Sequence, residues 1–256
     1  MNKASSVEIG FALLLATIVL GACTHKSSVT RGAVDSGSQP AVTAAKQFTT
    51  VRVDLRTERL EIFLRDEQGK PFNRFDRIAA SLAGRNLQLR FAMNAGMYQT
   101  DFSPLGLLVQ DGKEISPLNV RNGTGNFYMK PNGVFFVSAS GPRIVETSEY
   151  PGLAHDVKLA TQSGPLLVRN GVINAAFDPA STSRFVRNGV GISHDAVFFV
   201  ISEEPVTFYE LAIYFRDELK CPDALYLDGA VSSLYSVELH RNDSRVDLGP
   251  IVGVVR

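Results

Sequence analysis

The chain has 256 residues, of which 45% are hydrophobic and 20% charged, so it has enough apolar material for a full core and is not a disordered protein. Its 26 Lys and Arg residues balance 26 Asp and Glu residues, which leaves no general positive field to hold nucleic acid. An anionic ligand must therefore be bound by a few local cations, and a small substrate is favoured. Two cysteines, Cys23 and Cys221, are too few for a disulfide framework.

Residues 1–22 are predicted to be a lipoprotein signal peptide. An apolar run from Ile9 to Leu20 follows Lys3, and at about 1.5 Å per residue it is too short to cross a bilayer core of roughly 30 Å. The run ends in LGAC, which resembles the bacterial lipobox, whose cysteine is acylated. The resemblance predicts lipidation at Cys23 and attachment to the membrane without a spanning helix. The alternative is cleavage near Ala22, which would leave Cys23 free.

The predicted location is the bacterial periplasm, with the lipid anchor in the outer membrane. The outer membrane is favoured because Thr24, rather than Asp, follows the cysteine, as in lipoproteins sorted there. Residues 23–46 are rich in Ser, Thr, Gly and Ala without apolar periodicity, which predicts a flexible tether. A single domain is expected over residues 47–256, since no repeat and no second linker interrupts it.

The start of this domain alternates apolar and polar residues. This alternation predicts two strands that form a hairpin, at residues 51–55 and 60–64, and another strand at residues 87–91. Between them, helical spacing predicts a helix over residues 75–82, with Asn73 as its cap and Gly84 at its end.

The rest of the domain predicts further hairpins and a second helix. Apolar segments flank four turn signals: Asp111-Gly112, Asn122-Gly123, Ser140-Gly141 and Asn170-Gly171. A capping box at Thr207 and Glu210 begins the helix, and residues 224–227 and 250–255 predict short strands. The predicted fold class is α+β, with mostly antiparallel strands and hairpins and two main helices.

Common catalytic motifs do not occur. Gly189-Val190-Gly191 lacks the third glycine of a dinucleotide site, and Ser163 lies in QSGP rather than in a GxSxG elbow. The four histidines are not paired at ligand spacing, so we expect no structural zinc site. The sequence indicates no particular cofactor.

Polar residues instead follow or precede apolar strands. Asn94, Ser163 and Asp228 each end a predicted strand, and Arg184 and Arg187 precede NGVGI. Loops at such places often carry function. Taken singly, each residue is better explained by structure: Asp228 with the following glycine as a turn, the arginines as solvated side chains.

Five segments, in this order, change that assessment: NAGMY, PNGVFF, ATQSGPLLV, SRFVRNGVGI and YFRDELKCPDALYLDGAVSSLY. Together they resemble the phosphodiester glycosidase family, whose characterised member is the lysosomal uncovering enzyme, and the likeness runs from about Val51 to Val255. It is closest to bacterial periplasmic relatives of unestablished substrate. Many members carry LDGGGSS where this chain has Ala230 and Val231 in place of two glycines, which suggests a narrower pocket or a different sugar.

The resemblance implies hydrolysis of the sugar C1–O bond in a glycosyl-1-phosphodiester of the N-acetylhexosamine type, in the cell envelope. Asp228 is the expected essential carboxylate and Asp101 its partner, Arg187 would contact the departing phosphate, and Asn94 would hold a sugar hydroxyl or orient the carboxylate. The further residues expected to contact substrate are Tyr98, Lys130, Ser163, Gly164, Arg184, Gly229, Ser232 and Ser233. A divalent ion between Asp228 and Asp101 would have only scattered oxygen ligands, so no metal is assigned.

Two other functions stay open. The altered loop would suit a noncatalytic glycan-binding lipoprotein, and the same pocket could belong to a phosphodiesterase that breaks the P–O bond. The expected partners are a small-molecule or glycan phosphodiester and, through Cys23, the membrane, but no nucleic acid. The sugar, the aglycone, the stereochemical course and the oligomeric state do not follow from the sequence.

Overall fold

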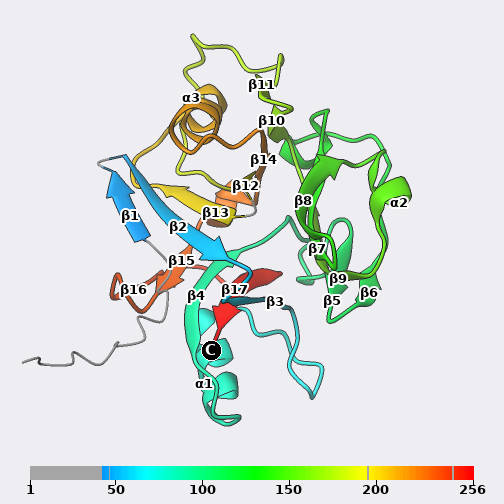
Figure 1. Ribbon diagram of the computed structural model, residues 1–256, viewed down its shortest axis with the longest axis vertical. Coiled ribbons are helices and arrows are strands. Elements are labelled where there is room, and N and C mark those ends of the chain that lie inside the picture. The colour runs from blue at the N-terminus through cyan, green and yellow to red at the C-terminus, as the bar shows by residue number, and fades with distance from the viewer. Residues whose placement is uncertain (1–41, 46, 195, 244) are drawn as a thin grey trace, which may run out of the picture. The chain divides into compact units, whose positions relative to one another are not determined.

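The computed structural model describes residues 42–45, 47–194, 196–243 and 245–256 (Figure 1). The predicted signal peptide, Cys23 and most of the predicted tether lie outside these residues. Val42–Ala45 were predicted to belong to the tether, but they form strand β1 and pair with β2 (Phe48–Asp54). Within the described segments, no helix is long and apolar enough to cross a membrane.

The strands form three antiparallel sheets. The seven-stranded sheet has the order β1, β2, β13 (Ala196–Ser202), β12 (Asn188–Ser193), β14 (Asp223–Tyr226), β10 (Leu166–Arg169) and β11 (Val172–Ile173). The second sheet has the order β16 (Arg241–Asn242), β15 (Leu234–Ser236), β4 (Leu89–Asn94), β17 (Ile251–Val255) and β3 (Arg59–Phe63). The third has β6 (Lys113–Ser116), β5 (Leu108–Gln110), β9 (Val157–Ser163), β7 (Gly133–Ser138) and β8 (Gly141–Glu146).

The helices are short. They are α1 (Phe75–Ala83), α2 (Tyr150–Leu153) and α3 (Phe208–Ile213), and α3 continues into a π-helical turn over Tyr214–Glu218. The prediction of mostly antiparallel strands is confirmed. The α+β class fits only loosely, because the described domain is dominated by its sheets.

The predicted hairpin of residues 51–55 and 60–64 is wrong. β2 pairs with β1 and β13 in the seven-stranded sheet, whereas β3 pairs with β17 in the second sheet. A turn redirects the chain between them, where Glu58 N donates to Asp54 O and the Glu58 carboxylate accepts from Asp54 N. Both strands carry buried apolar residues, and β13 and β17, which are distant in sequence, pair with them instead.

Three of the four predicted turns form hairpins. They join β5 to β6, β7 to β8 and β10 to β11. Asp111 and Asn170 adopt φ of 50°, a left-handed conformation that Asp and Asn tolerate. Asn122-Gly123 lies in a loop, so that hairpin prediction is wrong.

Both predicted helices form, but only one has its predicted cap. The capping box of Thr207 and Glu210 is present at α3. At α1 the cap residue is Arg74, which makes no side-chain cap bond. The Asn73 side chain instead donates to Leu248 O, so tertiary contact replaces the cap.

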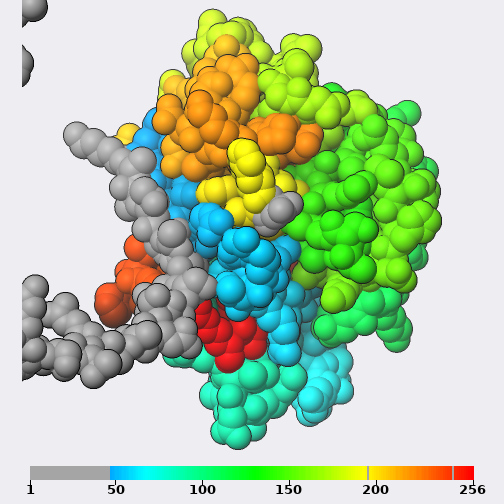
Figure 2. Space-filling view, viewed as in Figure 1, coloured from blue at the N-terminus to red at the C-terminus, as the bar shows by residue number. Residues whose placement is uncertain are grey.

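The central core joins all three sheets. The ring centroid of Phe199 in β13 lies 5.2 Å from the ring centroid of Phe91 in β4 and 6.1 Å from that of Phe135 in β7. In the space-filling view, the green third sheet packs directly beside the other segments of the domain (Figure 2). This common core places the ends of β4, β9 and β14 together with the start of β12.

Cys221 supplies a test of this packing, because burial raises the pKa of its thiol to about 12. In the full chain carrying Cys23→Ala, iodoacetamide at pH 8 should leave the native protein unmodified, since only about one thiol in ten thousand would be ionised. The same protein in guanidinium chloride should be alkylated quickly. Mass spectrometry measures both, and fast alkylation of the native state would contradict the buried position.

Candidate active site

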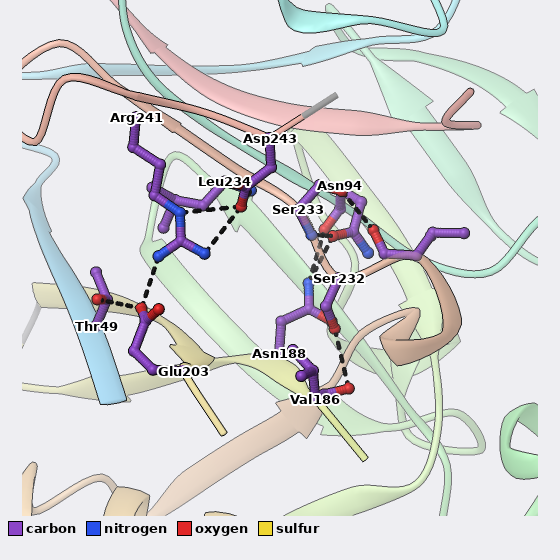
Figure 3. Close-up of polar contacts among 11 residues, drawn as sticks. Thr49, Asn94, Val186, Asn188, Glu203, Ser232, Ser233, Leu234, Arg241 and Asp243 are labelled. Atoms are coloured by element: carbon purple, nitrogen blue, oxygen red, sulfur yellow. Dashed lines mark hydrogen bonds and ion pairs between the residues drawn. The ribbon is translucent and has the colours of Figure 1, made fainter. Parts of the chain in front are cut away.

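The Asn94 side chain joins three segments at one point (Figure 3). Its Nδ2 donates to Asp228 O at 2.7 Å, and its Oδ1 accepts from Asn188 Nδ2 at 2.9 Å and from Ser233 N at 3.0 Å. Asn94 is 1% exposed. These contacts make Asn94 a residue that positions the Asp228 segment, rather than one that is free to hold a sugar hydroxyl.

Asp228 begins the loop that follows β14. Its N–H donates to Ala95 O at 3.2 Å, and its Oδ1 accepts from Ala230 N at 3.3 Å, which starts a 3-10 turn over Gly229–Val231. The side chain is half-buried, and burial raises its pKa. Such a carboxylate is a better base than an ordinary aspartate.

Tyr226 connects this loop to Arg187. A Cβ on Gly229 would lie 1.8 Å from Tyr226 Oη, so only glycine fits there. The buried Tyr226 hydroxyl interacts with the Gly229 backbone and with the Arg187 side chain, while burial raises the pKa of Tyr226. The phenol thus bridges the Asp228 loop and a cation.

Arg187 is a buried cation, only 2% exposed. Its Nε donates to Val206 O at 2.9 Å and its Nη2 to Ser183 O at 3.2 Å, while its Cζ lies 3.7 Å from the centroid of the Phe208 ring. Burial lowers the pKa of Arg187. No carboxylate of the described residues forms an ion pair with Arg187, and its described partners are these carbonyl oxygens, the aromatic rings and the Tyr226 hydroxyl.

Ser163, at the end of β9, lies beside the same group of strand ends. Its Oγ is buried and has no hydrogen-bond partner among the described atoms. Tyr226 N donates to Pro165 O at 3.1 Å, which holds the segment against β14. A Cβ on Gly164 would lie 2.6 Å from Phe127 O, so glycine is required there too. An unpaired buried hydroxyl costs about 1–3 kcal/mol, a cost that a polar ligand would remove.

The structure does not pair Asp101 with Asp228. Asp101 lies in an exposed turn, where its Oδ1 accepts from Ser103 N at 2.9 Å and from Ser103 Oγ at 2.5 Å, and these bonds lower its pKa. Its described contacts do not include Asp228, so no carboxyl separation predicts the stereochemical course. Nor do the described residues contain a cluster of three His, Cys, Asp or Glu side chains fit to hold a metal ion.

Two predicted cations are already engaged. Arg184 is exposed and forms a two-pronged ion pair with Glu210 at 2.7 and 3.0 Å. Lys130 donates from Nζ to Asn132 Oδ1 at 3.0 Å. Arg187 was predicted to contact the departing phosphate and Arg184 to contact the substrate, and the structure buries the first and exposes the second.

Tyr98 lies close enough to sense Asp228. Burial, followed by the charge of Asp228, raises the pKa of Tyr98 to about 12. Its Oη donates to Asp247 O at 2.8 Å, and a Cβ on Gly249 would lie 2.3 Å from its Cγ. Tyr98, which was expected to contact the substrate, therefore lies near the Asp228 carboxylate.

The two serines of the loop hold its shape. Ser232 Oγ donates to Gly229 O at 3.1 Å, and Ser233 Oγ donates to Val231 O at 2.8 Å. Asn188 and Tyr226 were missed as site residues. The available signals were an asparagine at the start of an apolar strand and a tyrosine two residues before Asp228.

The family model described as phosphodiester glycosidase matches residues 88–251. The chain belongs to the phosphodiester glycosidase family. It is 35% identical over 184 residues to the uncharacterized protein YigE of Escherichia coli (strain K12), and the match covers 72% of each chain.

Two solved structures share the fold. One is the catalytic domain of zebrafish N-acetylglucosamine-1-phosphodiester alpha-N-acetylglucosaminidase, auto-inhibited by its pro-peptide, with 17% identity, 86% of this chain and 79% of that chain covered, and a TM-score of 0.55. The other is a Burkholderia pseudomallei K96243 protein described as exported, with 11% identity, 81% and 73% coverage, and a TM-score of 0.51. At these identities the likeness shows the fold alone.

The departure from the family's LDGGGSS pattern has a structural explanation. Val231 is half-buried and packs against the cluster that contains Phe75 and Ile78 of α1, while Ala230 is exposed. The Val231 side chain is therefore used to hold the loop to α1.

Asp228 gives a pH-dependent stability test. Its raised pKa in the folded state means that the fold favours the protonated acid, so this stabilisation is present below the unfolded pKa of about 4 and is lost as pH rises through the folded pKa. Asp228→Asn should therefore raise Tm relative to wild type more at about pH 7.5 than at about pH 4. Scanning calorimetry measures this difference.

Asp111→Asn is the matched control, because it removes the same charge from an exposed turn whose φ of 50° suits asparagine. A lower Tm for Asp228→Asn than for this control at neutral pH would contradict the buried, disfavoured carboxylate.

Proposed function

We propose that this protein hydrolyses the sugar C1–O bond of glycosyl-1-phosphodiesters in the cell envelope, with an N-acetylhexosamine as the sugar. The observation that carries the proposal is Arg187, a buried cation without a described carboxylate partner, linked through Tyr226 to the loop of Asp228. Membership of the phosphodiester glycosidase family supports the reaction class. The zebrafish enzyme of the same fold is named for an N-acetylglucosamine-1-phosphodiester substrate, which supports the sugar.

The chemistry suits these groups. Breaking the C1–O bond develops positive charge on the sugar ring and expels a phosphate monoester. Because that leaving group is far better than a sugar hydroxyl, contact with a cation helps more than a strong acid does. In this mechanism Arg187 and Ser163 Oγ bind the phosphate, and the Asp228 carboxylate acts as a nucleophile at C1 or as a base toward water.

The other polar residues keep this arrangement rigid. Asn94 and Asn188 hold the backbone around Asp228, and the phenol of Tyr226 fixes the distance from the loop to Arg187. Reacting groups held by buried hydrogen bonds need little reorganisation during the reaction.

The decisive assay is turnover of N-acetylglucosamine-1-phosphodiesters, with free sugar and phosphate monoester both quantified. Asp228→Asn should lose at least about two decades in kcat/KM, equal to about 2.7 kcal/mol of transition-state stabilisation. Arg187→Met, which fills the space among the aromatic rings but lacks the charge, should lose a similar factor. Asp111→Asn should match wild type, and an Asp228→Asn variant within about tenfold of wild type would refute the role of this carboxylate.

Oxygen-18 water then distinguishes the bond that breaks. Label in the released sugar identifies C1–O cleavage, whereas label in the phosphate identifies a phosphodiesterase. Binding of the diester by folded wild type without any product would favour the glycan-binding function instead.

We further propose that the enzyme is attached to the outer membrane through lipid on Cys23. The LGAC segment supports the anchor, and the exported relative of the same fold supports secretion. Labelled palmitate should enter wild type and Cys221→Ala but not Cys23→Ala. Equal labelling of wild type and Cys23→Ala would refute the anchor.

A further inference from the structure

An exposed aromatic ring lies beside the buried cation of the site. Phe185 is 60% exposed and is the one aromatic among the large hydrophobic side chains that the described segments expose. The backbones of Phe185 and Val206 pair with each other: Phe185 N donates to Val206 O at 3.1 Å, and Val206 N donates to Phe185 O at 2.8 Å. The ring is therefore carried by a fixed segment.

The position of Phe185 follows from its neighbours. The Arg187 Cζ lies 5.3 Å from the Phe185 ring centroid and 3.7 Å from that of Phe208. Ser232 Oγ lies 3.4 Å from Val186 O, which places the segment beside the loop of Asp228. From Asp228 outward, the contacts pass through Gly229, Tyr226 and Arg187, and they end at Phe185.

This order has a consequence for the substrate, provided that the proposed function holds. With C1 at Asp228 and the phosphate at Arg187, the alcohol on the far side of the phosphate reaches Phe185. An alkyl chain loses no hydrogen bond when it lies against a phenyl ring, and the ring has no polar group to pair with the hydroxyls of a second sugar. We propose that Phe185 binds the aglycone and that the enzyme selects glycosyl phosphodiesters of apolar, lipid-like alcohols.

The proposed anchor agrees with this substrate class. A domain tethered by lipid at Cys23 would work at a membrane surface, where amphiphilic phosphodiesters gather. A soluble diester with a polar aglycone would need no such placement.

Kinetics with two aglycones test the proposal. Octyl and methyl phosphodiesters of N-acetylglucosamine are compared as substrates. Every protein tested is the full chain carrying Cys23→Ala. Wild type should prefer the octyl diester. Phe185→Ala should lower the preference for the octyl over the methyl diester in kcat/KM about tenfold, mainly through a higher KM for the octyl diester, while Phe185→Trp should keep the preference.

Val172→Ala is the matched control, since Val172 is 67% exposed and follows Gly171, whose N–H donates to Pro222 O at the opposite end of β14 from Asp228. It should behave as wild type. Equal losses on both diesters in Phe185→Ala would overturn the aglycone assignment.

A binding assay separates this inference from the proposed reaction. The chain contains no tryptophan, so Phe185→Trp introduces a single fluorophore and Val172→Trp its control. A phosphonate analogue of the octyl diester should shift the emission of Trp at position 185 only, and the methyl analogue should shift neither. This response without turnover would support the aglycone site while refuting the hydrolase, whereas turnover without the response would overturn the aglycone site alone.

Discussion

The buried amide of Asn94 is the contact on which the site depends. It is the point where the second sheet meets the seven-stranded sheet and the loop after β14, because it bonds to Asn188, Ser233 and Asp228 O together. A buried polar group left unpaired is costly, so these three segments must meet in one geometry. An aspartate there could accept both bonds but could not donate to Asp228 O, and a leucine could do neither. The place of Asp228 is therefore set by the sheets themselves.

The same packing keeps two charges in unfavourable surroundings. Burial disfavours the ionised Asp228 and the protonated Arg187, yet Tyr226 stands between them and they form no ion pair in the described structure. Direct pairing would neutralise both and leave little for a substrate. Held apart, they match a molecule with an anionic phosphate on one side and a sugar carbon that becomes positive on the other. The cost in stability is what makes the site ready to bind.

Features that depend on adjacent residues were predicted from the sequence, whereas contacts between distant segments were not. The capping box of α3 and the turns at Asp111 and Asn170 depend on a few adjacent residues, so the sequence was sufficient for them. The hairpin of β2 and β3 failed because alternation identifies a strand but not its partner. The cap at Asn73 failed for a similar reason, since Leu248 competes for that side chain.

The structure brings together some of the residues that were predicted for the site and separates others. Asp228, Asn94 and Arg187 lie at strand ends, where the pattern can be seen, and the structure brings them into one network. Asp101 is near Tyr98 in sequence, but its turn directs the carboxylate to Ser103. Arg184 and Arg187 are three residues apart, and only the packing of Phe208 and Val206 around the second distinguishes them.

The altered loop keeps the contacts that hold Asp228. Gly229 is the glycine that the structure requires, because a Cβ there would collide with the Tyr226 hydroxyl, and this chain keeps it. The two positions that depart from the family pattern are free of that constraint: Ala230 is exposed, and Val231 packs toward α1. The hydroxyls of Ser232 and Ser233 still close the turn. Ala230 and Val231 therefore leave the contacts that hold Asp228 in place, and the Val231 side chain adds a contact between the loop and α1.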